Sequence, residues 1–161
     1  MITLRELTLD DALAVQRIYS GASIRFTHTR PYSAVQARER VDRALTAARE
    51  EPRSRWDFGI LHAQDLVGLV SLRVPQRGIG TLSYILREDT WGNGYATEAV
   101  TQIVAFAFTA AGLERLEAKH HPHNPASGRV LSKAGFARSG TVDLPGKYRV
   151  IVPYPVYEIC A

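Results

Sequence analysis

Seven short stretches of the chain carry the apolar patterns expected of β-strands. Apolar and polar residues alternate most clearly in the first, from Ile2 to Leu7. The others cover residues 58–62, 66–74, 81–86, 116–120, 136–141 and 149–159. Pro153 and Pro155 interrupt the last stretch, because proline has no amide hydrogen to donate to a neighbouring strand. The sequence therefore predicts seven strands, the last of them broken.

Four other stretches repeat apolar residues at helical spacing. A first helix is expected to open at Asp10 and Asp11 and to end at Gly21, followed by an irregular segment over residues 21–32. The strongest helix ends at Gly112. Its apolar residues recur at intervals of three and four positions: Ala96, Ala99, Val100, Ile103, Val104, Ala107, Phe108 and Ala111.

Capping residues mark the two remaining helices. Ser33 and Gln36 have the spacing of a capping box, in which both side chains bond free backbone groups at a helix start. The helix that follows is expected to expose an arginine-rich polar face. Its expected buried stripe consists of Ala37, Val41, Ala44, Leu45 and Ala48. Asn124 and Pro125 open the last helix, and Gly135 lies just past its end.

The predicted elements follow in the order β-α-α-β-β-β-α-β-α-β-β. No repeat, low-complexity tract or linker divides the chain, so residues 1–161 are expected to form a single domain. This order predicts an α/β protein of the α+β kind, with a mixed sheet flanked by helices. A chain of 161 residues that is 45% hydrophobic can bury a core without disulfides or structural metal.

Composition also limits the compartment and the partners. Cys160 is the single cysteine, so no internal disulfide forms and a reducing compartment is expected. The first residues show no signal-peptide pattern, and no stretch approaches the roughly 20 apolar residues that a membrane span needs. These features predict a cytoplasmic protein without a membrane partner.

The chain is basic, with a formal net charge of +4 and 20 lysines and arginines, of which three are lysine. A basic balance can indicate nucleic-acid binding. The arginines are scattered, however, rather than clustered with aromatic residues, which favours a solvated surface and no nucleic-acid partner. A modest positive field still suits a phosphate-bearing cofactor.

A glycine-rich segment joins a predicted strand to the strongest helix. In Trp91-Gly92-Asn93-Gly94-Tyr95-Ala96, the glycines permit backbone angles and close approaches that side chains would block. The free amides of the helix start would then bind an anionic phosphate, and Thr97 would add a hydroxyl. A purely structural turn explains the glycines equally well. The segment matches neither a P-loop nor a dinucleotide-binding fingerprint.

A second segment covers residues 124–136. Asn124 is explained as a helix cap, and Val130 and Leu131 as core residues. Ser127 also has a structural interpretation, since a serine in the first helical turn can bond the backbone. The two segments together, about 30 residues apart in this order of strands and helices, indicate more than either one alone.

The chain resembles the GNAT N-acetyltransferase superfamily, and most closely its RimJ/RimL-like branch of ribosomal-protein-alanine acetyltransferases. The likeness covers nearly the whole chain and includes the opening residues Leu4-Arg5 and Leu9–Ala12. It implies a largely antiparallel central sheet and transfer of an acetyl group from acetyl-coenzyme A (acetyl-CoA) to a primary amine. The matching residues are Tyr84-Ile85-Leu86, Trp91–Ala99 and Asn124-x-x-Ser127-x-x-Val130-Leu131-x-Lys133-x-Gly135-Phe136.

The resemblance also implies where acetyl-CoA binds, with no metal involved. Its pyrophosphate would lie on the main-chain amides of the loop Gly92, Asn93, Gly94, Tyr95 and Ala96, beside Thr97. The pantetheine arm would enter a gap between the strands at 81–86 and 116–120, along Ile85 and Leu86, as an added strand does. Asn124 would bond the pantetheine and Ser127 would lie near the sulfur. Lys133 or Arg129 would meet the adenosine phosphates, or else remain solvated.

In this family a neutral amine attacks the thioester directly, with both substrates bound. Many relatives carry a glutamate near the start of the strand at 81–86, whereas this chain has Thr81 and Ser83 there and no carboxylate before Glu88. The departure favours an α-amine, already about a tenth neutral at pH 7, or a proton path through water. It is also the one feature that supports an alternative, a CoA-binding sensor or scaffold without turnover.

Three histidines follow the strand at 116–120, within Lys119-His120-His121-Pro122-His123. His121 is a candidate proton acceptor because imidazole titrates in the right range. Surface loop histidines are the alternative interpretation, and no cysteine or acidic pattern accompanies them to form a metal site. Ser127 is the first candidate for returning a proton to the departing thiolate, with Tyr84 and Tyr157 after it.

Acceptor recognition in this branch would come from residues 22–33 and 142–157. Arg25, His28 and Tyr32 suit an acidic or peptide-like acceptor, or else they hold the loop. The sequence leaves the acceptor open among a protein N-terminus, an amino acid, a polyamine and an amine antibiotic. A homodimer is one expected assembly, and a basic nucleic-acid-binding module is a third functional hypothesis.

Overall fold

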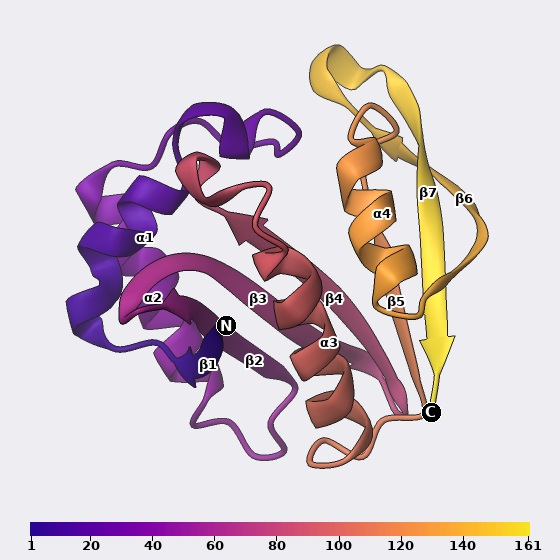
Figure 1. The fold of residues 1–161 in the computed structure, drawn as a ribbon, viewed down its shortest axis with the longest axis horizontal. Coiled ribbons are helices and arrows are strands. Elements are labelled where there is room, and N and C mark those ends of the chain that lie inside the picture. The colour runs from indigo at the N-terminus through magenta and orange to yellow at the C-terminus, as the bar shows by residue number, and fades with distance from the viewer.

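All seven strands belong to one sheet (Figure 1). The computed structural model describes residues 1–161, and the strand order is β1-β2-β3-β4-β5-β7-β6. The strands are β1 (Thr3–Glu6), β2 (Arg55–His62), β3 (Asp65–Gln76), β4 (Ile79–Leu86), β5 (Arg115–Lys119), β6 (Ala137–Pro145) and β7 (Ile151–Cys160). Only β4 and β5 pair in parallel. The predicted mixed, largely antiparallel sheet and the predicted order of elements are confirmed.

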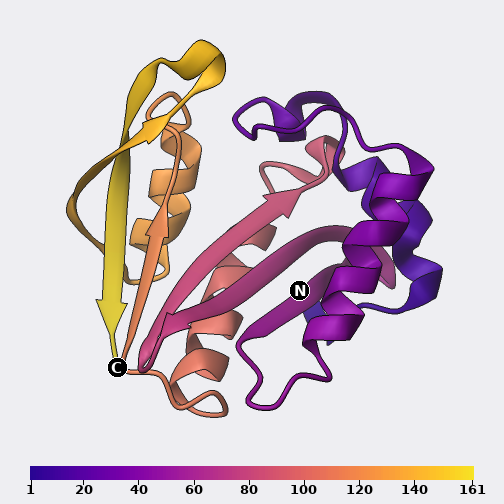
Figure 2. The ribbon, with the colours of Figure 1, turned by 180° about the vertical axis from the view of Figure 1, so that it is seen from behind.

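Four helices cover the two faces of the sheet, as the two opposite views in Figures 1 and 2 show. They are α1 (Ala12–Ile18), α2 (Ala34–Ala47), α3 (Tyr95–Phe108) and α4 (Pro125–Lys133). α1 and α2 bury Val15 and Val41 in one apolar cluster, whereas α3 and α4 bury Ile103 and Leu131 in another. Each cluster forms where the apolar stripe of a helix meets the sheet. No helix is long and apolar enough to cross a membrane.

Several element boundaries differ from the predicted ones. β2 begins at Arg55 rather than at residue 58, and the turn to β3 consists of Ala63 and Gln64 alone, because Asp65 already pairs with His62. α3 ends at Phe108, before the predicted end at residue 111. The irregular segment over residues 21–32 contains one turn of 3-10 helix.

β7 runs unbroken through Pro153 and Pro155, so the predicted interruption is wrong. The register of the strand explains why. β7 pairs with β5 only over residues 156–160, whereas it pairs with β6 over residues 151–158. Both prolines therefore lie where β7 has a neighbouring strand on one side only, and strands tolerate proline at such positions.

α2 carries a buried arginine, although the sequence predicted that the arginines of this helix lie on its exposed polar face. The capping box is present as predicted, with Ser33 Oγ accepting from the Gln36 amide at 3.2 Å. Arg40, however, is only 5% exposed and packs toward the sheet with Val41. Leu45 and Ala48 are half-buried, and Ala47 is buried instead. The expectation that the arginines of this helix are solvated is therefore wrong at Arg40.

Arg40 is buried because it meets an acidic partner. Its Nη2 donates to Asp57 Oδ1 on β2 at 2.8 Å and to Ser71 Oγ on β3 at 3.2 Å. Burial by itself would raise the pKa of Asp57, but hydrogen bonds from Arg55 and Ser71 and the charge of Arg40 lower it to about 2. The carboxylate therefore stays charged and ties α2 to two strands of the sheet.

Candidate active site

β4 and β5 separate toward their C-terminal ends, as Figure 2 shows. Their pairing covers only residues 79–82 of β4 and 115–118 of β5. β4 keeps its partner β3 as far as Leu86. The backbone groups on the opposite edge of residues 83–86 therefore face no strand and are available to a ligand.

The register of β4 fixes which residues present their backbone to this open edge. The Arg87 amide donates to the Val67 carbonyl on β3 at 2.7 Å. Because the direction of the backbone groups alternates along a strand, Ile85 also faces β3, whereas Tyr84 and Leu86 face the gap. Trp91 Nε1 donates to the Leu86 carbonyl at 3.1 Å, which is consistent with this assignment.

The glycine-rich loop delivers the start of α3 to the same end of the sheet. Gly92 and Gly94 have φ angles of +80° and +78°, and a Cβ at either position would meet nothing within 4 Å. Gly94 occupies the N-cap position, and no side chain caps the helix. The first amides of α3 therefore point into open space with the positive end of the helix dipole behind them, which is an arrangement that binds anions.

Two side chains of this segment are less available to a ligand than their backbone is. Asn93 Nδ2 donates back to the Thr90 carbonyl at 2.9 Å. The ring of Tyr95 stacks on His62 at 4.8 Å between centroids. The carbonyl of Thr97 accepts from Thr101 within the helix. What the segment offers a ligand is therefore mainly its amides.

Asn124 stands at the N-cap of α4, but its side chain makes no capping hydrogen bond. The predicted start of the helix is confirmed, with Pro125 in its first turn, whereas the predicted cap interaction is absent. The Asn124 amide donates to the His121 carbonyl at 2.9 Å, so backbone bonds hold the turn. The side-chain amide of Asn124 is thereby left free for another partner.

Ser127 and Tyr84 connect the two sides of the gap. The Tyr84 hydroxyl on β4 lies 2.6 Å from Ser127 Oγ on α4 and 3.2 Å from the Ser127 carbonyl. Burial, only partly offset by the bond to Ser127, raises the pKa of Tyr84 to about 12. Tyr84 therefore keeps its proton at neutral pH and can donate a hydrogen bond.

The histidines after β5 point in different directions. His120 is buried, its Nδ1 lies 2.7 Å from the His121 carbonyl, and its Nε2 has no partner. Since a carbonyl only accepts, Nδ1 carries the hydrogen, and the ring lies under Gly128 of α4 beside Tyr157. His121 instead stacks on Phe26 of the α1–α2 loop at 5.1 Å between centroids.

His121 belongs to a pocket of about 540 Å³ between three segments that are distant in the sequence. Arg25 and His28 line it from the α1–α2 loop, as the sequence placed them. Lys147, from the β6–β7 turn, also lines it. The sequence marked that turn only as part of a segment, because an exposed lysine in a turn carries no signal of its own.

Tyr32 is not among the residues that line this pocket. Its ring stacks on Tyr19 of α1 with centroids 4.2 Å apart, and its amide donates to the Tyr19 carbonyl at 3.0 Å. The structure therefore gives Tyr32 the alternative role of holding the α1–α2 loop.

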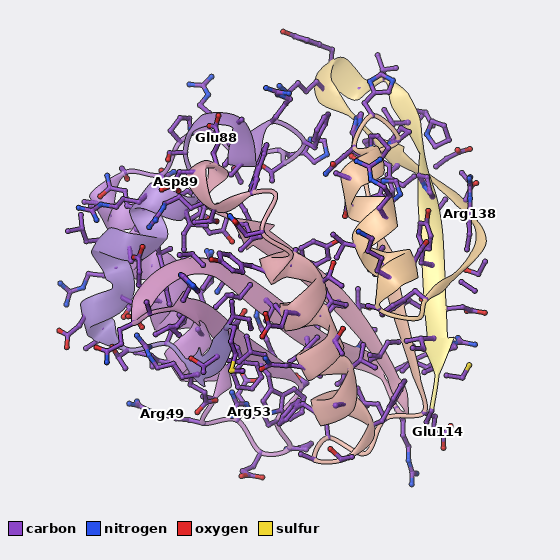
Figure 3. The ribbon with its side chains drawn as sticks, viewed as in Figure 1. Arg49, Arg53, Glu88, Asp89, Glu114 and Arg138 are labelled. Atoms are coloured by element: carbon purple, nitrogen blue, oxygen red, sulfur yellow. The ribbon has the colours of Figure 1, made fainter.

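A second anchor for that loop comes from Glu88, just after β4. Glu88 Oε2 accepts from the Ala22 amide at 2.8 Å, and Figure 3 shows Glu88 beside this part of the loop. In the sequence, Glu88 stands out only as the first carboxylate after the strand. A contact across so many residues leaves no local pattern by which it could be found.

Lys133 and Arg129 lie away from Ser127 on α4. Together with Arg138 of β6, which Figure 3 labels, they line a separate groove of about 470 Å³ between α4 and the β6–β7 strands. Ser127 and Tyr84 do not line this groove. No group of three or more His, Cys, Asp or Glu side chains is placed to hold a metal ion.

Solved acetyltransferases share this fold. The microcin C7 self-immunity acetyltransferase MccE, solved with acetyl-CoA and AMP, gives a TM-score of 0.88 at 15% identity and covers 99% of this chain and 92% of that one. RimJ of Mycobacterium smegmatis, solved with CoA-disulfide, gives 0.84 at 22% identity, covering 99% and 82%. Identities this low establish a common fold and no more.

Sequence comparison establishes the family. The GNAT acetyltransferase domain matches residues 1–137. The uncharacterized N-acetyltransferase p20 of Bacillus licheniformis is 27% identical over 143 residues, which cover 86% of this chain and 80% of that protein. The chain belongs to the GNAT acetyltransferase family and is an acetyl-CoA-dependent N-acetyltransferase.

Proposed function

We propose that this enzyme transfers the acetyl group of acetyl-CoA directly to a primary amine, on a protein N-terminus or a small molecule, with both substrates bound at once. The observation that carries the proposal is the position of His121. It lines the acceptor pocket, and its carbonyl accepts the amide hydrogen of Asn124 at the start of α4. The amine pocket and the thioester gap would therefore open beside one another, so that no covalent acetyl-enzyme is needed.

The cofactor is proposed to lie across the open end of β4. Its pyrophosphate would bind the amides at Gly92–Thr97, and its pantetheine arm would bind the open backbone edge at Tyr84 and Leu86. The free side chain of Asn124 would bond the pantetheine amides. An edge amide of β4 would also stabilise the charge that develops on the thioester oxygen.

His121 is the proposed proton acceptor. Burial, reinforced by the positive charge of His123, lowers the pKa of His121, so its ring is neutral at pH 7. Nδ1 accepts the His123 amide hydrogen at 3.1 Å, which places the lone pair on Nδ1 and the hydrogen on Nε2. His121 takes a proton, directly or through a water, when Nδ1 releases that bond. An α-amine is already about a tenth neutral at pH 7, so a weak base is sufficient to remove its proton.

Ser127 and Tyr84 are the proposed proton donors to the departing thiolate. Tyr84 stays protonated, and its single hydroxyl hydrogen can be directed at Ser127. The hydrogen of the Ser127 hydroxyl is then free to point at the sulfur of CoA. This arrangement would stabilise the thiolate as the carbon–sulfur bond breaks.

A CoA-binding protein without turnover is the second candidate. The observation that favours it is the presence of Thr81 and Ser83 where many relatives carry a glutamate on this strand. The neutral imidazole of His121 in the acceptor pocket supplies a different proton acceptor. We therefore favour turnover over the non-catalytic role.

Thiol release from acetyl-CoA tests the proposal across a panel of amines. The panel contains short peptides with varied N-terminal residues, single amino acids, polyamines and aminoglycosides. We expect release that depends on one class of amine. Clear binding of acetyl-CoA without amine-dependent release from any member would instead support the non-catalytic candidate.

A further inference from the structure

The three segments that form the acceptor pocket contain no carboxylate side chain. They are residues 21–33 between α1 and α2, residues 119–125 from the end of β5 to the start of α4, and residues 144–156 around the β6–β7 turn. The chain as a whole has 16 aspartates and glutamates. The pocket between these segments is therefore positive in a protein that is otherwise of mixed charge.

Cationic side chains line the pocket from opposite sides. Arg25 comes from the α1–α2 loop and Lys147 from the β6–β7 turn, and both are exposed. Neither forms an ion pair with a carboxylate, whereas six other arginines of the chain do. These two cations are therefore free to attract an anion that enters the pocket.

The carboxylate that touches this region is already engaged. Glu88 bonds the Ala22 amide at the base of the loop, and it is not among the residues that line the pocket. His28, His121 and His123 line the pocket as well, and the charges of His28 and His123 contribute to lowering the pKa of His121. Additional positive charge in the pocket would therefore meet no neutralising partner among the lining residues.

We infer that the acceptor is an amine that carries an anionic group, a carboxylate or a phosphate, and that polycationic amines are excluded. The inference rests on the proposed function, because it assigns the class of substrate for the same pocket. Arg25 and Lys147 would bind the anionic group, while the amine would lie toward His121 and the thioester. A polyamine or an aminoglycoside would bring several positive charges to a pocket without a carboxylate to receive them.

Three peptides that differ in one side chain provide the test. Ala-Glu-amide, Ala-Gln-amide and Ala-Lys-amide present the same α-amine, whose pKa stays near 8, and differ mainly in the charge beside it. We expect kcat/KM for Ala-Glu-amide to exceed that for Ala-Lys-amide by about tenfold at low ionic strength, and the ratio to shrink as salt is added. Phosphoethanolamine, compared with ethanolamine, tests a phosphate in place of the carboxylate.

Variants that lack these charges test whether Arg25 and Lys147 cause the preference among the peptides. The double variant Arg25→Gln/Lys147→Gln is expected to treat the three peptides alike. The matched control, Arg43→Gln/Arg77→Gln, removes the same charge from the exposed face of α2 and from the β3–β4 turn. The control should keep the preference, because neither of its residues lines the pocket.

Binding of the same peptides to the enzyme–CoA complex, measured by calorimetry, separates this inference from the proposed function. A charge preference in binding without any turnover would uphold the inference and overturn the proposed catalysis. Turnover without a charge preference would uphold the proposed catalysis and overturn the inference. A preference for Ala-Lys-amide or spermidine, or a preference that survives in the Arg25/Lys147 variant, would overturn the inference.

Discussion

The proposed cofactor side and the proposed acceptor side of this enzyme are built from different chemical groups. The cofactor side combines the open edge of β4 with the uncapped start of α3, and it offers mainly backbone amides and carbonyls. The acceptor side offers side chains, among them Arg25, His121 and Lys147, from three segments that are distant in the sequence. A few local rules position backbone groups, whereas the whole fold positions side chains on separate loops.

This difference predicts opposite sensitivities to mutation. On the cofactor side, a change that blocks or reshapes the backbone should be severe, and loss of a surface side chain should be mild. On the acceptor side, individual charges and rings should set which amine is used, while the binding of acetyl-CoA remains unchanged.

The largest effect is expected at Arg40, which is buried against the sheet and does not line the pocket. Replacing Arg40 with leucine leaves Asp57 buried with only Arg55 and Ser71 as partners, and should lower the free energy of unfolding by about 3 kcal/mol. The loss should show in urea denaturation. Arg43→Leu, on the exposed face of the same helix, should change stability by no more than about 0.5 kcal/mol. Equal losses in the two variants would contradict the role given to the buried ion pair.

The same pair makes a prediction about acid stability. Because the pKa of Asp57 is lowered from 3.8 to about 2, its contribution to stability is present above the unfolded value and is lost as the pH falls from 3.8 toward 2. In the Arg40→Leu variant the pKa of folded Asp57 rises toward the unfolded value, so this loss should be smaller and should be complete at a higher pH. Urea midpoints measured across this pH range would show the shift.

The next effect concerns the glycine-rich loop. Gly94→Trp should weaken acetyl-CoA binding by about 100-fold or more, because its side chain would enter the open space where the pyrophosphate is proposed to lie. Gly112→Trp is the matched control. Gly112 also has a positive φ angle and open space around it, but it lies past the far end of α3. Both variants carry similar backbone strain, of about 1–2 kcal/mol. Tight binding by the Gly94 variant in calorimetry would reject the pyrophosphate site.

A smaller effect is expected where the two sides meet, at Ser127. Ser127→Ala should lower kcat by about 10- to 100-fold while changing the Kd for acetyl-CoA by no more than about threefold. Tyr84→Phe should lower kcat less, and the double variant should be little worse than Ser127→Ala alone, because the two groups act together. Ser132→Ala, on another face of α4, is the control. Unchanged kcat in Ser127→Ala would return Ser127 to a structural role.

The smallest effect is expected at His121. Its pKa lies below 6.5 and it accepts a proton only when neutral, so kcat/KM should fall as the pH drops through that lowered value. His121→Asn should remove this acidic limb and reduce kcat/KM at pH 7 by about tenfold. His123→Asn removes a neighbouring positive charge and should instead move the limb to higher pH. An identical acidic limb in all three proteins would exclude His121 as the base.

The contrast between the two sides also explains what the sequence could predict. The helix starts and the strand before Trp91 follow local patterns of glycine, proline and apolar spacing, so the elements of the proposed cofactor side were largely predictable. The Ile85 backbone faces β3 rather than the gap, which only the register of the sheet reveals. Arg40 was predicted to be exposed because the sequence pattern of a charged residue on an apolar helix face is the same with or without a buried partner. The partner, Asp57, lies on a strand of the sheet and is distant in the sequence.

On the proposed acceptor side, the sequence marked two segments that line one pocket but did not predict how they converge. Arg25 and His28 line it, whereas Tyr32 turns away to stack on Tyr19. Lys147 was missed because its place opposite Arg25 results from how the β6–β7 turn folds over, and no spacing rule encodes that. Side chains that come together from distant segments produce no periodic pattern in the sequence.

Initial rates measured with both substrates varied test most directly whether the two substrates are bound at the same time. Initial rates of thiol release would be measured while acetyl-CoA and an alanyl peptide are varied against each other. If the cofactor gap and the acceptor pocket are occupied together for direct transfer, double-reciprocal plots should intersect, and no acetylated enzyme should be seen by intact mass spectrometry. Parallel plots with an acetylated enzyme would contradict the account, because they would require the acetyl group to rest on the protein before the amine arrives.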